Sequence, residues 1–400
     1  MTNVNPVLVV GAGPVGFVAT LRLAQNGIPV VLIDKEPTLQ DDLRASTFHP
    51  PTLEMLDELD LAAGLLALGL KADSWQIRMH ETHERAVFDL SLLADDTRYP
   101  FRLQAEQRSL CALAASRVTS EPLVDYQPGH ELIDIAQNEN EVTATLKDSA
   151  GEERRIVTPW LIAADGAGSR VRELLELEFA GLTYPETTIL ATTHFPFEEH
   201  LPGLSNVNYV WFKGGTFSLL RLPDIWRCSL YSDAGETEAD ALGPASIERK
   251  LQHVVPKNTP YEVEEIRPYR IHQRILKNYR VGRILLAGDA AHLNSPSGGM
   301  GMNGGIHDAF NLTEKLTAVW RGDSPPEFLD LYSRQRQPIA EDQILKQAHT
   351  NRSRMQEKDP AVRAAEMQCL QRIASDREAC REYLLRSSMI AGLRQAAEIV

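Results

Sequence analysis

Long hydrophobic runs, paired cysteines and an excess of basic residues are all missing from this 400-residue sequence. The longest apolar stretch, Leu61 to Leu70, is about half of the roughly 20 residues that cross a bilayer, so no membrane span is expected. The 4 cysteines form no CxxC pair and show no zinc-ligand spacing with histidine, which predicts a reducing compartment and no metal site. The net charge of −14 argues against a nucleic-acid partner.

A secretory signal and a repeat pattern are missing as well. The first residues, MTNVNPVLVV, contain no basic segment and lead into glycines without a cleavage-site pattern, so we expect a cytoplasmic protein. At 400 residues the chain exceeds the usual size for one hydrophobic core. This length predicts two domains or one large composite domain.

The beginning of the chain alternates as strand, turn, helix and strand. Val7 to Val10 is a continuous aliphatic run, typical of a strand buried on both faces. The glycine pattern of residues 11–16 (GAGPVG) opens a helical segment, and a second strand at 30–33 ends in Asp34. This context is the dinucleotide-binding fingerprint, with glycines for a tight turn against pyrophosphate and a carboxylate for the ribose hydroxyls. The fingerprint does not separate NAD from FAD, and the alternative is a glycine turn with no ligand.

Later segments predict a sheet and a helical end. Between residues 75 and 90, and again between 187 and 232, the apolar period shifts toward two, which indicates an antiparallel sheet. Residues 160–163 and 284–287 are expected to be further buried strands, and from Asn303 onward the pattern is helical.

One helical stretch near the end carries an apolar stripe. Its members recur at helical spacing: Val362, Ala365, Cys369 and Ile373. Such a stripe predicts either a core face or a contact between two copies of the chain in a homodimer.

Two further motifs, taken with the first, resemble those of a known family. Residues 164–172 (ADGAGSRVR) resemble the DGxxSxxR motif of flavoprotein monooxygenases, and residues 288–292 (GDAAH) with 296–303 (PSGGMGMN) resemble their GD motif. The three motifs occur in the family's order and span most of the chain. The sequence therefore resembles the class A flavoprotein monooxygenases, the FAD-dependent aromatic hydroxylases similar to para-hydroxybenzoate hydroxylase. No second GxGxxG follows a strand, which disfavours the flavin oxygenases with two nucleotide domains.

The resemblance implies an α/β fold with a discontinuous Rossmann-like FAD-binding domain, an inserted antiparallel-sheet substrate domain and a helical C-terminus. The expected FAD-binding domain comprises residues 1–72, 101–175 and 276–335. The expected substrate domain comprises residues 73–100 and 176–275, and a C-terminal helical region follows at 336–400.

The resemblance also implies the cofactor-binding residues. They are turn glycines, their neighbours and polar side chains from the three motifs and two intervening positions: Gly11, Gly13, Pro14, Val15, Gly16, Asp34, Lys35, Arg44, Gln107, Asp165, Gly166, Gly288, Asp289, Pro296, Gly298, Gly299, Gly301, Met302 and Asn303. The glycines of residues 298–301 would bring bare main chain against the flavin ring. His292 is expected to be a scaffold residue of its motif. Asp34 and His307 stand where the family often has Glu and Arg, which puts flavin mobility and substrate access in doubt.

The implied activity is that of a single-component monooxygenase. NADH or NADPH would reduce FAD, O2 would add to give a flavin hydroperoxide, and oxygen would pass to a small aromatic or heteroaromatic, phenol-like ring. Because the hydroperoxide decays in water, the pocket must be dry and apolar. Two alternatives remain: a related flavin oxidoreductase that reduces or dehydrogenates its substrate without oxygen insertion, and a nucleotide-binding module without catalysis.

A base within reach of the substrate would make a phenol a better nucleophile, and histidine has the unperturbed pKa nearest neutrality. The candidates are His49, His194 and His272, with Tyr209 as a relay; the alternative for each histidine is a structural or surface role. The expected substrate-binding residues are mostly apolar or aromatic: His194, Trp211, Phe217, Leu219, Arg221 and Pro296. For the sheet residues the alternative is ordinary core packing, and for Arg221 it is a surface cap.

Overall fold

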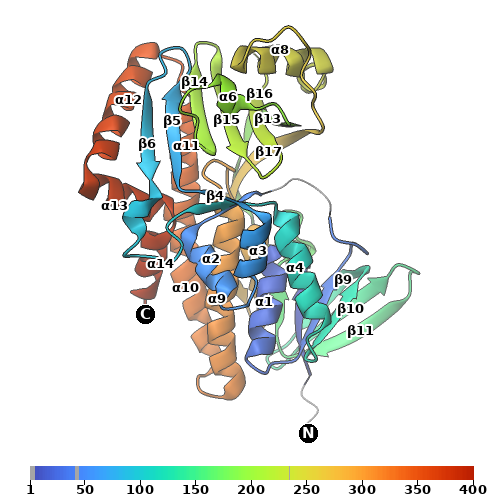
Figure 1. Cartoon of the computed structure of the whole chain (residues 1–400). Helices are drawn as coiled ribbons and strands as arrows, with labels where there is room; N and C mark the ends of the chain where they lie inside the picture. Colours follow the sequence, from blue (N-terminus) through green and yellow to red (C-terminus); the bar gives the residue numbers. More distant parts are fainter. Residues whose placement is uncertain (1–4, 41–44, 234) are drawn as a thin grey trace.

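A six-stranded sheet carries the first glycine motif in the computed structural model, which describes residues 5–40, 45–233 and 235–400 (Figure 1). In spatial order its strands are β18 (Arg280–Val281), β19 (Ile284–Leu286), β12 (Leu161–Ala163), β1 (Val7–Val10), β2 (Val30–Asp34) and β8 (Val124–Pro128). The strands from β19 to β8 run parallel, and only the edge strand β18 is antiparallel to its neighbour. Parallel strands share one direction, so the carboxyl ends of β1, β2, β12 and β19 meet at one edge, where ligands bind in sheets of this kind.

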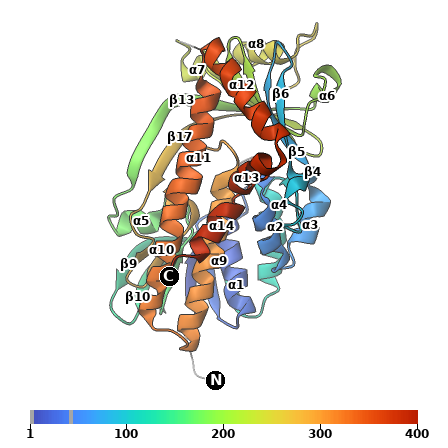
Figure 2. The same ribbon diagram turned by 90° about the vertical axis from the view of Figure 1, so that its left-hand side faces the viewer.

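Helices cover this sheet and approach it closely at glycines. They are α1 (Pro14–Gln25), α2 (Pro50–Asp57), α3 (Ala62–Leu68), α4 (Gln107–Thr119), α5 (Arg170–Leu174) and α9 (Met300–Arg321). Helices α1 and α9 lie side by side (Figures 1 and 2). A Cβ atom on Gly305 would lie 2.6 Å from Cγ2 of Val15 and 2.9 Å from Cα of Gly288. Gly305 therefore lets α9 approach both the first helix and the turn after β19.

Two small sheets flank this layer. One has the order β3 (Thr47–Phe48), β7 (Arg102–Gln104) and β4 (Leu70–Ala72), and the other has the order β11 (Glu153–Thr158), β10 (Val142–Asp148) and β9 (His130–Gln137). Strands β3 and β7 are antiparallel, with Thr47 opposite Gln104 and Phe48 opposite Leu103. This register brings the next residue of the first segment, His49, toward the position of Arg102.

The second large layer is an eight-stranded sheet. Its order is β20 (His292–Leu293), β17 (Ile266–Ile275), β13 (Ala180–Thr193), β16 (Trp226–Tyr231), β15 (Gly215–Arg221), β14 (Val207–Phe212), β5 (Ser74–Met79) and β6 (Arg85–Asp89). Side chains alternate between its two faces. One face forms a core with α8 (Pro244–Val254) near α6 (Phe197–His200) and α7 (Glu238–Ala241). The opposite face, including Trp75 and Trp211, packs against the C-terminal helices (Figure 1).

The C-terminal part is helical. Its elements are α10 (Asp330–Ile339), a π-helical segment η4 (Ala340–Lys346), α11 (Gln347–Gln356), α12 (Pro360–Ser375), α13 (Arg377–Ser387) and α14 (Ile390–Ala397). Short 3-10 segments occur at η1 (Leu90–Leu93), η2 (Gly288–Ala290) and η3 (Pro326–Leu329). Figure 2 shows α10 and α11 as one long rod that runs past both large sheets. Pro338 lies inside α10 just before the π-helical segment, and proline removes a helical hydrogen-bond donor.

The structure confirms the expected α/β fold class, and the strands expected at 160–163 and 284–287 are β12 and β19. The last long helical region begins at Met300 and not at Asn303. A core face at Val362 and Ala365 is wrong, because both side chains are exposed and α12 buries Arg363, Met367 and Leu370 instead. The homodimer contact and the domain boundaries stay predictions. Within the described part of the chain, no helix combines the length and apolarity that a membrane span requires.

Candidate active site

The turn between β1 and α1 leaves open space at its middle glycine. Gly11 has φ +103°, and a Cβ atom there would lie 2.4 Å from the Ala164 carbonyl oxygen. A Cβ atom on Gly16 would lie 1.8 Å from the Gly11 carbonyl oxygen. Among the residues that the structure describes, no atom lies within 4 Å of a Cβ atom placed on Gly13, which caps the N-terminus of α1. The outer glycines are therefore required by the protein's own packing, whereas Gly13 leaves room for an anion at a helix N-terminus.

The carboxylates of the first two motifs lie at the same edge of the parallel sheet. Asp34 accepts hydrogen bonds from the Ala12 N–H at 2.6 Å and the Glu36 N–H at 2.9 Å. Asp165 follows β12, and its Oδ2 accepts from the Val171 N–H at 3.0 Å. Its Oδ1 is buried without a hydrogen-bond partner in the described part of the chain, and burial raises the pKa of this carboxyl group. A buried acceptor without a donor fits a ligand that carries hydroxyl groups, as FAD does.

Arg172 joins the second motif to the third. Its Nη1 donates to the Ala290 carbonyl oxygen at 3.0 Å, and its Nη2 donates to the Ala167 carbonyl oxygen at 2.5 Å. Burial lowers the pKa of Arg172, while the charges of Asp165 and Asp289 oppose this effect. Asp289 itself is exposed after β19. The three motifs expected to bind FAD thus converge on one edge of the sheet.

The loop before α9 is shaped by two glycines and one asparagine. Gly298 and Gly299 have φ of +96° and +67°, in the left-handed region that other residues rarely adopt. The Asn303 side chain donates to the carbonyl oxygens of Thr47 at 2.8 Å and Gly299 at 2.6 Å, and it accepts from the His49 N–H at 2.9 Å. Because both of its N–H groups are used, Asn303 holds the loop in place and has no side-chain donor left for a cofactor.

His49 also supports the loop before α9. Its Nε2 lies 2.8 Å from the Gly298 carbonyl oxygen, which can only accept, so Nε2 carries the proton. Its Nδ1 is buried without a partner. Burial and the charge of Arg102 lower the pKa of His49 well below its ordinary value, so the ring is neutral at pH 7. His49 is therefore a buried neutral support for the loop main chain.

A buried ionic cluster anchors the third motif. Asp308 accepts hydrogen bonds from Nε2 of His292 at 2.8 Å, the Gly288 N–H at 3.1 Å and Nε of Arg336 at 2.7 Å. Burial alone would raise the pKa of Asp308, but Arg336 and His292 hold it at about 2. The ring of Tyr279 stacks on His292 with centroids 5.9 Å apart. These bonds tie the turn after β19 to α9 and α10, which fits the scaffold role expected of His292.

His307 predicts how stability depends on pH. Its Nε2 lies 2.9 Å from Oγ1 of Thr52, and burial together with Arg336 lowers its pKa to about 3. The unfolded chain binds a proton near pH 6.5, which the folded chain does not bind until about pH 3. The free energy of unfolding should therefore fall by about 1.4 kcal/mol per pH unit from this residue alone as pH drops below 6.5.

Urea unfolding of the holoenzyme at pH 7, 6 and 5 measures this effect. The variant His307→Gln should show a shallower loss of stability toward acid than the parent. His130→Gln is the matched control, because His130 is only partly buried and bonds to the Pro128 carbonyl oxygen at the surface. Parallel pH profiles for the parent and His307→Gln would contradict the prediction.

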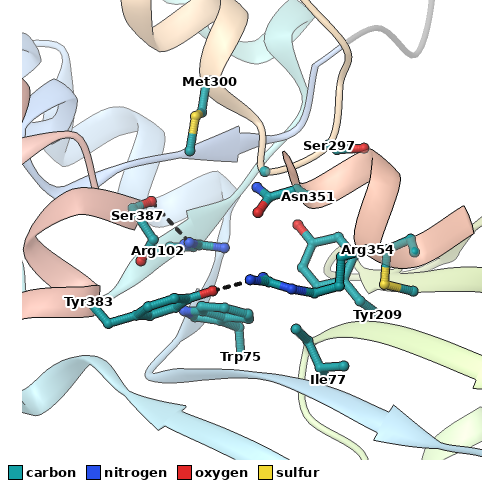
Figure 3. Close-up of a pocket in the computed structure, with 12 residues that line it drawn as sticks. Trp75, Ile77, Arg102, Tyr209, Ser297, Met300, Asn351, Arg354, Tyr383 and Ser387 are labelled. Atoms are coloured by element: carbon teal, nitrogen blue, oxygen red, sulfur yellow. Dashed lines mark hydrogen bonds between the residues drawn. The ribbon is translucent and has the colours of Figure 1, made fainter. Parts of the chain in front are cut away.

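An aromatic cavity lies beside the loop before α9 (Figure 3). Rings, aliphatic side chains and two arginines line it, contributed by β5, β7, β14, the loop, α11 and the end of α13: Trp75, Ile77, Arg102, Tyr209, Ser297, Gly298, Met300, Asn351, Arg354, Met355, Tyr383 and Ser387. Figure 3 shows the guanidinium groups of Arg102 and Arg354 directed into the space bounded by Trp75, Tyr209 and Tyr383. The cavity walls are therefore mostly aromatic and aliphatic, and two guanidinium groups give the cavity positive charge.

Arg102 is the most deeply placed charge in this cavity. It is 2 % exposed, its Nη2 donates to the Ser387 carbonyl oxygen at 3.2 Å, and its guanidinium lies 5.0 Å from the Trp75 ring centroid. Burial lowers its pKa, and its side chain also hydrogen-bonds to Tyr209. Its Nε has no partner, and no ion pair to a carboxylate is seen for Arg102 among the described residues. A buried cation without a counter-ion is a site for an anion.

The predicted substrate residues divide between the two faces of the eight-stranded sheet. Tyr209 lines the aromatic cavity, and Trp211 on the same strand is buried and donates from Nε1 to the Arg354 carbonyl oxygen at 3.0 Å. Phe217 and Leu219 lie on the opposite face, in the core with α8. An apolar period of two predicts a strand, but it does not indicate which face of the sheet borders the aromatic cavity.

Four other predicted residues lie away from the aromatic cavity. Arg221 pairs with Glu198 at 2.9 Å. His194 is 57% exposed and bonds to Glu264 at 2.8 Å, while Nδ1 of His272 lies 2.9 Å from Oγ1 of Thr183. Pro296 is exposed, and its carbonyl oxygen accepts from the Gly299 N–H at 2.9 Å.

The remaining predicted cofactor residues lie around the sheet edge. Pro14 and Val15 begin α1, Lys35 is exposed directly after β2, and Gln107 begins α4, with its N–H donating to the Ala45 carbonyl oxygen at 2.9 Å. Gly166 has φ +79° and, like Gly13, open space where a Cβ atom would be. Gly301 and Met302 lie in the first turn of α9. Arg44 lies outside the described residues.

Sequence reasoning missed Arg102, Arg354, Asp308 and Arg336. A signal existed for Arg102, because it stands between the apolar residues Phe101 and Leu103. Asp308 similarly interrupts a run of small and apolar residues. Arg354 gave no such signal, since its surroundings in sequence are polar.

Comparisons with known proteins agree with this geometry. A family described as "FAD binding domain" matches residues 5–347. The chain is 32% identical over 398 residues to para-nitrophenol 4-monooxygenase of Pseudomonas sp. (strain WBC-3), covering 98% of both chains. It is 32% identical over 339 residues to 6-hydroxy-3-succinoylpyridine 3-monooxygenase HspB of Pseudomonas putida (strain DSM 28022 / S16), covering 84% of this chain and 85% of the relative.

A solved structure gives the same result. The crystal structure of p-nitrophenol 4-monooxygenase PnpA from Pseudomonas putida DLL-E4 superposes with a TM-score of 0.90 at 30% identity, covering 98% of both chains. These findings confirm the expected cofactor set of FAD, a reduced nicotinamide and O2, and they do not favour a flavin enzyme without oxygen insertion. The chain belongs to the FAD-binding-domain family and is a class A flavoprotein monooxygenase, an FAD-dependent aromatic hydroxylase.

Proposed function

We propose that this enzyme hydroxylates a small phenol that is bound as its phenolate, with the phenolate oxygen on Arg102. The observation that carries this proposal is a buried guanidinium that has no carboxylate partner among the described residues, in an aromatic cavity next to Gly298. Three relatives are named for a nitrophenol, a chlorophenol and a hydroxypyridine, all small rings that carry a hydroxyl group.

The chain's own residues bind the ring, activate it and exclude water. Bound FAD, held by the three motifs, supplies the redox chemistry of oxygen transfer. Arg102 and the Tyr209 hydroxyl donate hydrogen bonds to the phenolate oxygen, which favours the ionised form and raises the electron density of the ring. Trp75 and Met300 enclose the ring against the loop at Gly298.

This proposal assigns the activation of the phenol to a cation and not to a histidine base. Neither His49 nor His272 lines the aromatic cavity, whereas Tyr209 does. His49 acts in the proposal through the Gly298 carbonyl oxygen, as a positioning residue. We further propose a cytoplasmic location, where NADH and NADPH are available, and a homodimer.

The test is turnover of 4-nitrophenol with NADH or NADPH under 18O2. We expect phenol-stimulated oxidation of the nicotinamide and one 18O atom in each product molecule. A panel of phenols, aminophenols and hydroxypyridines then ranks substrates by the stimulated rate of flavin reduction. Product without label, or turnover that proceeds without O2, would overturn the proposal.

A further inference from the structure

A second hollow adjoins the aromatic cavity on the side of α11 and α12. This outer groove has a volume of about 560 Å³ and is lined by residues of both helices, among them Ser353, Arg363 and Glu366. Of the described residues that line the two hollows, only Arg354 belongs to both. The side chain of Arg354 therefore lies at the boundary between the outer groove and the place where the ring would bind.

Two partners on opposite sides hold this side chain across the boundary. Nε of Arg354 contacts Oε1 of Glu366 at 2.6 Å on the groove side, and its Nη1 donates to the Tyr383 hydroxyl at 3.1 Å on the cavity side (Figure 3). The side chains of Arg354 and Glu366 are 16% and 34% exposed. Because Arg354 is mostly buried and bonded to both partners, opening requires that an entering group replace its bond to Glu366.

The main chain at this point is fixed. The carbonyl oxygen of Arg354 accepts from Nε1 of the buried Trp211 at 3.0 Å, near the end of α11. This bond holds the main chain of Arg354, so in the proposed opening it is the side chain that changes rotamer. Such a change joins the groove to the cavity without disturbing the residues that hold FAD.

The charges along this route are mixed in the groove and cationic beyond the boundary. Arg363 is 5% exposed and donates to the carbonyl oxygens of Phe212 at 2.7 Å and Gly215 at 2.9 Å, and the carboxylates of Glu357 and Glu366 also line the groove. Arg354 follows at the boundary, and Arg102 lies inside. These two arginines, at the boundary and inside the cavity, attract an anion that has passed the mixed charges of the groove. At the boundary, an incoming phenolate competes with Glu366 for Arg354.

We propose that Arg354 and Glu366 form the access gate to the aromatic cavity and select anionic phenols by this competition. The choice of a phenolate as the selected molecule rests on the proposed function. The gate determines which aromatic molecules enter, and Arg102 determines which remain bound.

The first test measures association of 4-nitrophenolate with the oxidised holoenzyme by stopped-flow absorbance, without a reductant. Glu366→Gln keeps the shape of the partner and removes its charge, so the association rate constant should rise about fivefold. Arg354→Ala should remove the preference in association rate for 4-nitrophenolate over neutral 4-nitroaniline, while Arg102 still favours the bound anion. Glu58→Gln is the matched control, because Glu58 pairs with Arg22 at 2.8 Å far from both hollows. Parent-like association rates in both gate variants would overturn the proposal.

The second test reports on the gate without any phenol. In a Ser387→Cys background the new thiol lies in the aromatic cavity, and its alkylation by iodoacetate or iodoacetamide is followed by peptide mass spectrometry. Adding Glu366→Gln should raise the rate with anionic iodoacetate about fivefold, and the rate with neutral iodoacetamide less. If labelling responds but 4-nitrophenolate never binds the parent, the gate stands and the proposed function fails. If the phenolate binds but labelling does not respond, the gate is overturned and the proposed function stands.

Discussion

Replacing Arg102 with methionine should lower kcat/KM for 4-nitrophenol by about 10- to 100-fold, because a hydrogen bond to a charged group contributes about 1.5–3 kcal/mol. Methionine fills the buried space without a charge, so the variant should still fold and bind FAD. Phenol-stimulated reduction of the flavin should be lost, while the slow oxidation of the nicotinamide without phenol should stay at the parent rate. Steady-state kinetics and anaerobic stopped-flow reduction measure these two quantities.

The pH dependence of turnover distinguishes whether Arg102 promotes ionisation of the phenol or only shapes the cavity. The parent should bind 4-nitrophenol as phenolate below the pKa of the free phenol, because Arg102 favours the anion. Arg102→Met should move the acid limb of kcat, which reports the pKa of the bound phenol, toward the pKa of the free substrate. Arg102→Lys keeps the charge but not the planar fork of donors, so it should recover part of the activity at an unshifted pH. An acid limb in Arg102→Met that coincides with that of the parent would exclude the proposed role.

The cofactor edge of the fold was predictable from sequence because local chemistry specifies it. The tight turn at Gly11, the helix that follows it and the carboxylate at Asp34 are each required by short-range geometry, and they occur within one βαβ unit. The motifs at Asp165 and Asp289 could be placed beside them once each was seen to follow a buried strand, since parallel strands end at one edge. The buried partners of Asp308 could not be predicted from sequence, because His292 and Arg336 belong to two other elements of the chain.

The residues of the aromatic cavity were harder to predict from sequence, because they come together from distant segments of the chain. Trp75 and Tyr209 lie on neighbouring strands of one sheet, whereas Arg354 and Tyr383 come from helices near the C-terminus. The aromatic residues of β14 and β15 were recognised as sheet residues, but Phe217 and Tyr209 belong to opposite faces. Strand periodicity gives alternation only, and tertiary packing decides which face meets the cofactor.

Replacing Gly13 with aspartate should leave folding intact and lower the affinity for FAD by about 100-fold or more, the loss expected when two charge-assisted hydrogen bonds are removed. A Cβ atom at this position has no atom of the described residues within 4 Å, and aspartate is a preferred residue at a helix N-cap. The apoprotein should therefore be as stable as the parent apoprotein or slightly more stable. In the holoenzyme the new carboxylate would occupy the open space with a negative charge, where the pyrophosphate of FAD needs the N–H groups of α1.

Gly16→Ala is the matched control for this prediction, because it adds one methyl group where the chain has no room. Its Cβ atom would lie 1.8 Å from the Gly11 carbonyl oxygen, so the apoprotein itself should lose stability. The flavin content of the purified proteins, titration of the stripped proteins with FAD and urea unfolding of the apoproteins measure the two effects separately. Gly13→Asp protein that retains a full complement of flavin would show that the pyrophosphate does not lie against this turn. Equal losses of apoprotein stability in both variants would show that Gly13 serves the fold, and the distinction between the ligand-facing glycine and the packing glycine would then be wrong.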